Sequence, residues 1–139
     1  MDYTYYFKQY LYEGNDWVKN CGLRWGGLTD SEVHLYADVK ESNLSGIGFL
    51  HGGVIFTLAD TTAGFLAHSQ GEAYVTMDAK INFIKSATKG TLRCDASYIH
   101  KGKKTALIHT VVVDDEGILL MDGTFTMIRV DKVYKELEK

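Results

Sequence analysis

The sequence predicts an α+β fold in which a curved antiparallel β-sheet wraps around one central helix. Three observations lead to this expectation: one long segment that is apolar on nearly all sides, two strand-like segments before it, and four after it. A helix without a polar face must be enclosed by other elements in a soluble protein. Short connections between strand-like segments favour antiparallel neighbours. A sheet curled around the helix satisfies both requirements.

The central helix is expected over residues 54–68, where apolar side chains leave almost no polar face. Gly52 and Gly53 stand just before this segment. Two glycines inside a helix would cost on the order of 2 kcal/mol relative to alanine, so the helix is predicted to begin at this pair. The turn-rich segment 42–48 leads into it.

The other elements are predicted from the spacing of their apolar residues. Helical spacing over residues 2–13, ending before Gly14, indicates a short amphipathic helix. Looser alternation over 17–28 and 32–40 indicates a pair of strands with glycine turn or bulge chemistry between them. Four further strands are predicted to form a meander over 73–85, 90–100, 104–114 and 118–130.

Composition restricts the class of protein. The 139 residues are expected to form one domain over 1–139, and 45% hydrophobic with 24% charged residues is typical of a soluble globular chain. A net charge of −3 disfavours nucleic acid and anionic membranes as partners. With neither a leader nor a membrane-spanning run in the sequence, we expect a cytoplasmic protein. Cys21 and Cys94 stand alone, so neither a disulfide framework nor a metal site is expected.

Asp60 is a carboxylate in the middle of the apolar helix, where ionisation is costly unless another group compensates for the lost water. One interpretation is structural: the carboxylate bonds to a neighbouring backbone group or hydroxyl, with Thr57, Thr61 and Thr62 as the obvious local partners. The other interpretation is a functional acid or base. Position alone leaves both open.

His51, Gly52 and Gly53 form a second feature, because a helix N-terminus carries unpaired N–H groups that can stabilise a developing oxyanion. The alternative is a simple N-terminal cap with His51 packed just outside. His51 and Asp60 are nine residues apart, which on one helix means about 13 Å of rise and roughly half a turn of rotation. If both are catalytic, the site must combine two subunits, which predicts an obligate dimer.

Residues 48–61 (GFLHGGVIFTLADT) resemble the core motif of hotdog-fold acyl-CoA thioesterases of the phenylacetate-degradation (PaaI-like) branch. Residues 75–83 (VTMDAKINF) are similar to the strand that follows the helix in that family, and residues 99–106 (IHKGKKTA) to its next hairpin. The resemblance covers about 80 residues and implies a thioester hydrolase of the hotdog fold. It also implies a homo-oligomer, a dimer or a homotetramer built from two dimers.

The resemblance implies a role for each motif residue. The Gly52 N–H polarises the thioester carbonyl, His51 positions that loop, and Asp60 of the partner chain acts as base or nucleophile. Thr76 supplies a hydroxyl that helps hold the attacking water. Such chemistry needs a stabilised oxyanion and an activated water or carboxylate, so no cofactor is expected beyond the coenzyme A of the substrate itself.

The expected substrate contacts include one departure from the family pattern. Gly53 and Thr61 belong to the motif and are expected to lie beside the substrate. Family members commonly carry asparagine at the position of Ser45, whereas Asn43 stands two residues earlier. Either Asn43 reaches the site through a rearranged loop or that hydrogen bond is missing.

Lysines are the candidates for the phosphates of coenzyme A. Lys101, Lys103 and Lys104 surround Gly102 at a predicted hairpin tip, and Lys85 is a second candidate at the rim. A lysine-rich tip that is merely solvated is the alternative. Cys94 is interpreted as packing, and the remaining histidines as surface or strand residues, at positions 34, 68, 100 and 109.

Two other functions fit the same fold. An enoyl-CoA hydratase or dehydratase needs an acid and a base placed together, and no second titratable residue lies three or four positions from Asp60. A non-catalytic acyl-CoA-binding protein would keep the cleft but commonly adds an output segment, for which a single domain over the whole chain leaves no room. Hydrolysis of an acyl or aryl CoA ester is the preferred interpretation.

Overall fold

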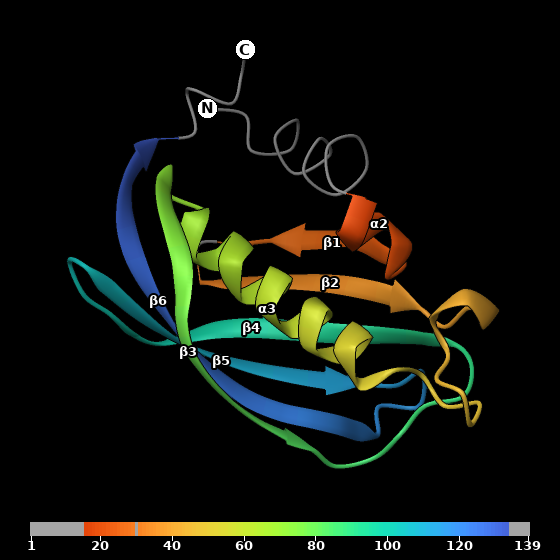
Figure 1. The fold of residues 1–139 in the computed structure, drawn as a ribbon. Helices are drawn as coiled ribbons and strands as arrows, with labels where there is room; N and C mark the ends of the chain where they lie inside the picture. Colours follow the sequence, from red (N-terminus) through yellow and green to blue (C-terminus); the bar gives the residue numbers. More distant parts are fainter. Residues whose placement is uncertain (1–15, 30, 134–139) are drawn as a thin grey trace.

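The computed structural model describes residues 16–29 and 31–133. A six-stranded antiparallel sheet curves around one long helix (Figure 1), as the sequence predicts. The predicted helix over 2–13 lies outside the described residues. The elements are α2 (Asp16–Asn20), β1 (Leu23–Leu28), β2 (Glu32–Asp38), the 3₁₀ turn η2 (Glu41–Asn43), α3 (Gly52–His68), β3 (Glu72–Phe83), β4 (Thr91–Lys101), β5 (Thr105–Val113) and β6 (Leu119–Val133).

Helix α3 begins at Gly52, which confirms the predicted start at the glycine pair. Its inner residues, such as Leu58, Ala59 and Leu66, are completely buried against the concave face of the sheet. The helix ends at His68, and Gly71 then takes a φ of 92°, a left-handed conformation that favours glycine. Ten of the seventeen residues of α3 are buried, which explains why this segment has almost no polar face.

The predicted strand over 17–28 is wrong in its first half. Residues Asp16–Asn20 form helix α2, and β1 begins only at Leu23. Val18 and Cys21 are both buried, and their spacing of three residues fits a helical turn better than a strand. Gly22, with a φ of 80°, separates the two elements. The expected glycine bulge is confirmed, because the β1–β2 register shifts between Trp25 and Gly27.

The predicted four-strand meander is also wrong, because β3 does not neighbour β4. The sheet order is β1-β2-β4-β5-β6-β3, so only β4, β5 and β6 form a meander. Strand β3 pairs with β6, and β4 pairs with β2. The segment between β3 and β4 runs along the end of the sheet, where Leu50 N–H bonds to Ala87 O and Val39 N–H to Gly90 O.

This order makes β3 an edge strand of twelve residues. Among the described residues only β6 pairs with it, with Thr76 opposite Met127 and Phe83 opposite Met121. Strand β3 runs beside α3 (Figure 1), so that its first half lies near the end of the helix and its second half near the start. Within the described part of the chain, no helix is long and apolar enough to cross a membrane.

Candidate active site

Asp60 is partly buried in the middle of α3 and accepts a hydrogen bond from Thr76 of β3, with 2.5 Å between the Thr76 hydroxyl oxygen and Oδ1. The hydroxyl oxygen also lies 3.3 Å from the Met127 sulfur. Burial raises the pKa of Asp60 above its usual value, and the Thr76 bond opposes that shift. Within the described part of the chain, the neutral Thr76 hydroxyl is the one donor that holds the carboxylate, and partial burial makes Asp60 more basic than an exposed aspartate.

The local hydroxyls on α3 do not bond to Asp60. Thr57 donates to Gly53 O at 2.8 Å and Thr62 to Leu58 O at 2.6 Å, so both serve the backbone of their own helix. The partner of Asp60 comes instead from β3, sixteen residues along the chain. Asp60 therefore does bond to a hydroxyl, as the structural interpretation expects, but the donor is Thr76 and not one of the local threonines on α3.

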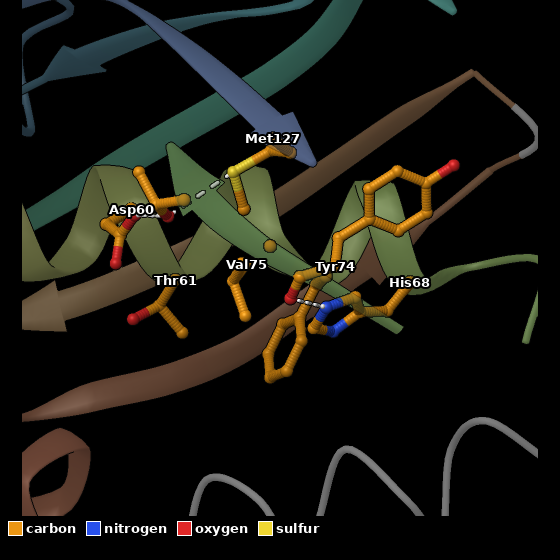
Figure 2. Close-up of a pocket in the computed structure, with 9 residues that line it drawn as sticks. Asp60, Thr61, His68, Tyr74, Val75 and Met127 are labelled. Carbon is orange, nitrogen blue, oxygen red and sulfur yellow. Dashed lines mark hydrogen bonds between the residues drawn. The ribbon is translucent and has the colours of Figure 1, made fainter. Parts of the chain in front are cut away.

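Asp60 opens into a hollow of about 230 Å³ between α3 and β3. Figure 2 shows Asp60 and Thr61 at one end of this hollow and His68 and Tyr74 at the other. Besides Asp60 and Thr76, its walls include Thr61, Gly64, Phe65, His68, Val75 and Met127. We call this space the Asp60 hollow.

His68 is neither a surface nor a strand residue, which corrects the expectation for this histidine. It lies in the last turn of α3, and its Nε2–H donates to Tyr74 O at 2.8 Å. Burial lowers the pKa of His68, so the imidazole is uncharged at neutral pH. Gly64 and His68 follow Asp60 by four and eight residues, so helical spacing alone identifies them as neighbours on its face.

The Gly52 N–H is the free donor at the start of α3. His51 is the N-cap, and its Nδ1 accepts the Gly53 N–H at 2.8 Å, which occupies the second glycine donor. No acceptor within residues 16–29 and 31–133 pairs with the Gly52 N–H. Gly52 lines a second hollow, of about 260 Å³, together with Phe83 and Lys85. His51 therefore both caps the helix and leaves one donor exposed beside Phe83.

Asn43 serves the loop rather than the hollow at Gly52. Its side chain accepts from Lys40 N–H at 2.8 Å and donates to Cys21 O and Asp38 O. Its own carbonyl accepts the His51 N–H at 3.0 Å, so Asn43 reaches the site through its backbone. The Ser45 N–H bonds to Phe49 O. The loop before α3 is therefore held both by the Asn43 side chain and by backbone bonds.

The candidate lysines lie in two places. Lys85 is exposed and borders the hollow that contains Gly52. Lys101, Lys103 and Lys104 are exposed on the β4–β5 hairpin, and Lys101 Nζ lies 5.3 Å from the centroid of the Tyr98 ring. Of the two groups, only Lys85 shares a hollow with a motif residue of the same chain.

The thiols and the other carboxylates of the described residues form no second site. Cys94 is completely buried, and burial raises its pKa to about 12, so it remains a protonated packing group. Among the described residues, no group of three or more His, Cys, Asp or Glu side chains is placed to hold a metal ion. His109 pairs with Asp122 at 3.2 Å on the face of the sheet opposite α3, away from both hollows.

Comparison with known proteins agrees with this arrangement. The family model described as the thioesterase superfamily matches residues 47–121, which is more than half of the chain. The chain belongs to the thioesterase superfamily. The match spans α3 with both Gly52 and Asp60, and it continues through β3 to the start of β6.

Individual relatives give the same result. The acyl-coenzyme A thioesterase PaaI of Escherichia coli is 29% identical over 107 residues, 76% of each chain. The crystal structure of that PaaI protein superposes with a TM-score of 0.84 over 93% of this chain and 94% of that one, at 24% identity, which shows the shared fold. The Streptococcus mutans protein smu.793, solved bound to acetyl CoA, is 29% identical to this chain. Its structure superposes with a TM-score of 0.79 and covers 88% of this chain and 98% of that one. The predicted hotdog fold and PaaI-like thioester hydrolase are confirmed.

The raised pKa of Asp60 predicts how pH affects stability. Above the folded-state pKa, folding must bury an ionised carboxylate, which costs free energy, whereas below the ordinary pKa both states are protonated and the cost vanishes. We therefore expect Asp60→Asn to raise the melting temperature at pH 7 and to lose this advantage as the pH falls toward 4. Thermal unfolding across that pH range measures it. A variant that is less stable at pH 7 would contradict the assigned direction.

Proposed function

We propose that this protein hydrolyses acyl or aryl coenzyme A thioesters at a site formed by two copies of the chain. One observation carries the proposal: the free Gly52 N–H lies beside Phe83 at the end of the edge strand β3, whereas the Asp60 carboxylate lies beside Thr76, seven residues earlier on the same strand. Gly52 is next to Phe83, whose ring lies 3.7 Å from the position a Cβ would take there, and Asp60 is bonded to Thr76.

The two groups do not meet within one chain. They line separate hollows, and Asp60 follows Gly52 by eight positions, a helical rise of about 12 Å. Along β3, Thr76 and Phe83 are seven residues apart, or roughly 23 Å. A thioester carbonyl cannot contact both an oxyanion donor and a base at that separation. A second chain supplies what the first lacks.

The free edge of β3 is suited to contact a second copy. Val75, Met77 and Phe83 are 49%, 57% and 55% exposed, and a long apolar edge is a surface that natural proteins normally cover. A two-fold axis between Ala79 and Lys80 pairs β3 with its copy in antiparallel fashion. That axis exchanges the strand ends, so Phe83 and Gly52 of one chain meet Thr76 and Asp60 of the other.

The composite site accounts for thioester hydrolysis. The Gly52 N–H and the positive end of α3 bind the carbonyl oxygen as it gains charge. Asp60 of the partner either takes a proton from the attacking water or attacks the carbonyl carbon itself. With water as the nucleophile, the carbon–sulfur bond then breaks, the leaving coenzyme A thiolate takes up the proton that Asp60 removed from water, and the free acid is released. With Asp60 as the nucleophile, breakage of the carbon–sulfur bond leaves an acyl–Asp60 anhydride, and a water molecule then hydrolyses that anhydride to release the acid and restore the carboxylate. Thr76 keeps Asp60 oriented toward this position.

The direct test is an assay of thiol release from a panel of acetyl, hexanoyl, benzoyl and phenylacetyl CoA. We expect turnover of at least one ester, with a kcat near the range of about 1 to 1,000 per second that is common for enzymes. The names of the relatives, an acyl-CoA thioesterase and a protein bound to acetyl CoA, support this choice of substrates. Binding of every ester without release of thiol would indicate a non-catalytic acyl-CoA-binding protein.

A hydratase is tested in the same experiment, because His68 brings a second titratable group into the Asp60 hollow. An enoyl-CoA ester is therefore added to the panel, and the loss of its conjugated double bond is followed by absorbance. We expect thiol release without hydration. Hydration without thiol release would overturn the proposed reaction and favour an enoyl-CoA hydratase.

The phosphates of coenzyme A are expected to meet the lysines at the rim. Exposed contacts of this kind contribute about 0.5–1 kcal/mol each and weaken with salt. Replacing Lys101, Lys103 and Lys104 together with alanine should raise KM several-fold and change kcat little. An N-acetylcysteamine thioester, which lacks the phosphates, should show no such loss.

Lys85→Ala is the matched variant, since Lys85 shares the hollow of Gly52. If Lys85→Ala raises KM more than the triple variant does, the phosphates of coenzyme A bind near Lys85 and not at the β4–β5 hairpin. Equal losses on the long and truncated substrates would mean that the hairpin lysines support the fold instead. No loss in either variant would mean that the hairpin is a solvated tip.

A further inference from the structure

We propose that the Asp60 hollow receives the acyl group and that Gly64 sets the largest acyl group that it accepts. This inference rests on the proposed thioester hydrolysis and adds a specificity-determining residue to it. Gly64 lies one helical turn beyond Asp60 and forms part of the same wall. Gly64 lies outside the family motif at residues 48–61.

Packing does not explain a glycine at position 64. Glycine is the least favourable residue in a helix interior apart from proline, and Gly64 lies inside α3, four residues before the helix ends at His68. Its φ is not positive, so its backbone does not need glycine. Among the described residues, a Cβ at this position would meet only the Met127 Cε, at 3.7 Å, which is an ordinary van der Waals contact. What an added side chain would change is the space inside the hollow.

The shape of the hollow fits an acyl group better than it fits the coenzyme. Phe65, Val75 and Met127 give it apolar walls, and His68, bonded to Tyr74 O, lies at its far end. The described residues that line it include no lysine or arginine. The hollow at Gly52 contains Lys85, so the charged end of the substrate is expected to leave on that side.

The volume sets the size class of the acyl group. An apolar cavity of about 150 Å³ accepts benzene, so a hollow of about 230 Å³ holds one aromatic ring or a short acyl chain and is too small for two rings. Filling the space above Gly64 should therefore exclude groups of this size first, and an acetyl group last.

The test compares Gly64→Ala and Gly64→Leu by kcat/KM for hexanoyl, benzoyl and acetyl CoA. One methylene in a hydrophobic pocket is worth about 10- to 200-fold in selectivity. We expect the hexanoyl-to-acetyl ratio to fall at least ten-fold in Gly64→Leu and less in Gly64→Ala. Met127→Ala, which enlarges the same hollow, should shift the ratio the opposite way. Melting temperatures show whether each variant folds.

Binding separates this inference from the proposed reaction. The affinities of hexyl and methyl CoA thioethers, which cannot be hydrolysed, are measured for the same variants by calorimetry. A selective loss of the hexyl thioether supports the role of Gly64 even if the wild-type chain hydrolyses nothing, an outcome that would overturn only the proposed reaction. A uniform loss for all ligands, or no change in selectivity, would overturn the assignment of the acyl group to this hollow.

Discussion

Replacing Asp60 with asparagine is expected to lower kcat for acyl-CoA hydrolysis by at least about 100-fold, because the amide can neither take a proton from water nor attack the thioester. The fold should persist, since the Asn Oδ1 can still accept the Thr76 hydroxyl that Asp60 accepts at 2.5 Å. Steady-state kinetics on the best ester, together with circular dichroism, measures both effects. KM should change much less than kcat.

Asp78→Asn is the matched control for this change. Asp78 is an exposed carboxylate on the same strand as Thr76, two residues further along, so its replacement removes the same charge near the same edge. We expect it to retain most of the activity. If Asp60→Asn turned over substrate at a rate close to that of the wild type, Asp60 would have no part in the chemistry.

The pH profile gives an independent check on Asp60. The reaction needs the ionised carboxylate, and burial raises the pKa of this group above its usual value. Activity should therefore fall as the pH drops through a midpoint above that of an exposed aspartate, while the protein stays folded. Thr76→Ala removes the bond that opposes the shift, so the midpoint should move to higher pH.

The sequence predicts the two functional features of the helix because each is a residue type that is unusual at its position in a helix. Asp60 stands out as a charge among apolar residues, and Gly52 stands out as a poor helix former at a helix start. Both features are local and visible within twenty residues. The contact between Asp60 and Thr76 is not local, since it depends on where β3 lies in the sheet. Only the resemblance to a known family suggested Thr76.

The sheet order is the part that the sequence does not predict. Alternation identifies strands but not their neighbours, and a short connection between β3 and β4 favours a hairpin that does not form. Strand β3 crosses to the far edge beside β6 instead, with Phe83 opposite Met121. That position creates the free edge on which the composite site depends. Residues outside the motif, such as His68, were missed although helical spacing from Asp60 identifies them.

Gly52→Pro is expected to lower kcat by about 100- to 1,000-fold, because proline removes the proposed oxyanion donor. Position 52 is the first residue of α3, where proline is tolerated, and His51 already has the extended conformation that precedes proline, with φ −62° and ψ 131°. Gly52→Ala keeps the N–H, and its Cβ would lie 3.7 Å from the Phe83 ring, an ordinary contact. The alanine variant should therefore lose much less activity than the proline variant.

Combining the two inactive variants tests whether the site contains two chains. When Gly52→Pro and Asp60→Asn chains with different affinity tags are co-expressed, a mixed dimer has one site with both defects and one site with none. Random pairing makes half of the dimers mixed, so activity should return to about one quarter of the wild-type value. The purified mixed dimer should reach about half. If Gly52 and Asp60 of the same chain formed the site, every site would carry one defect, and mixing would restore nothing.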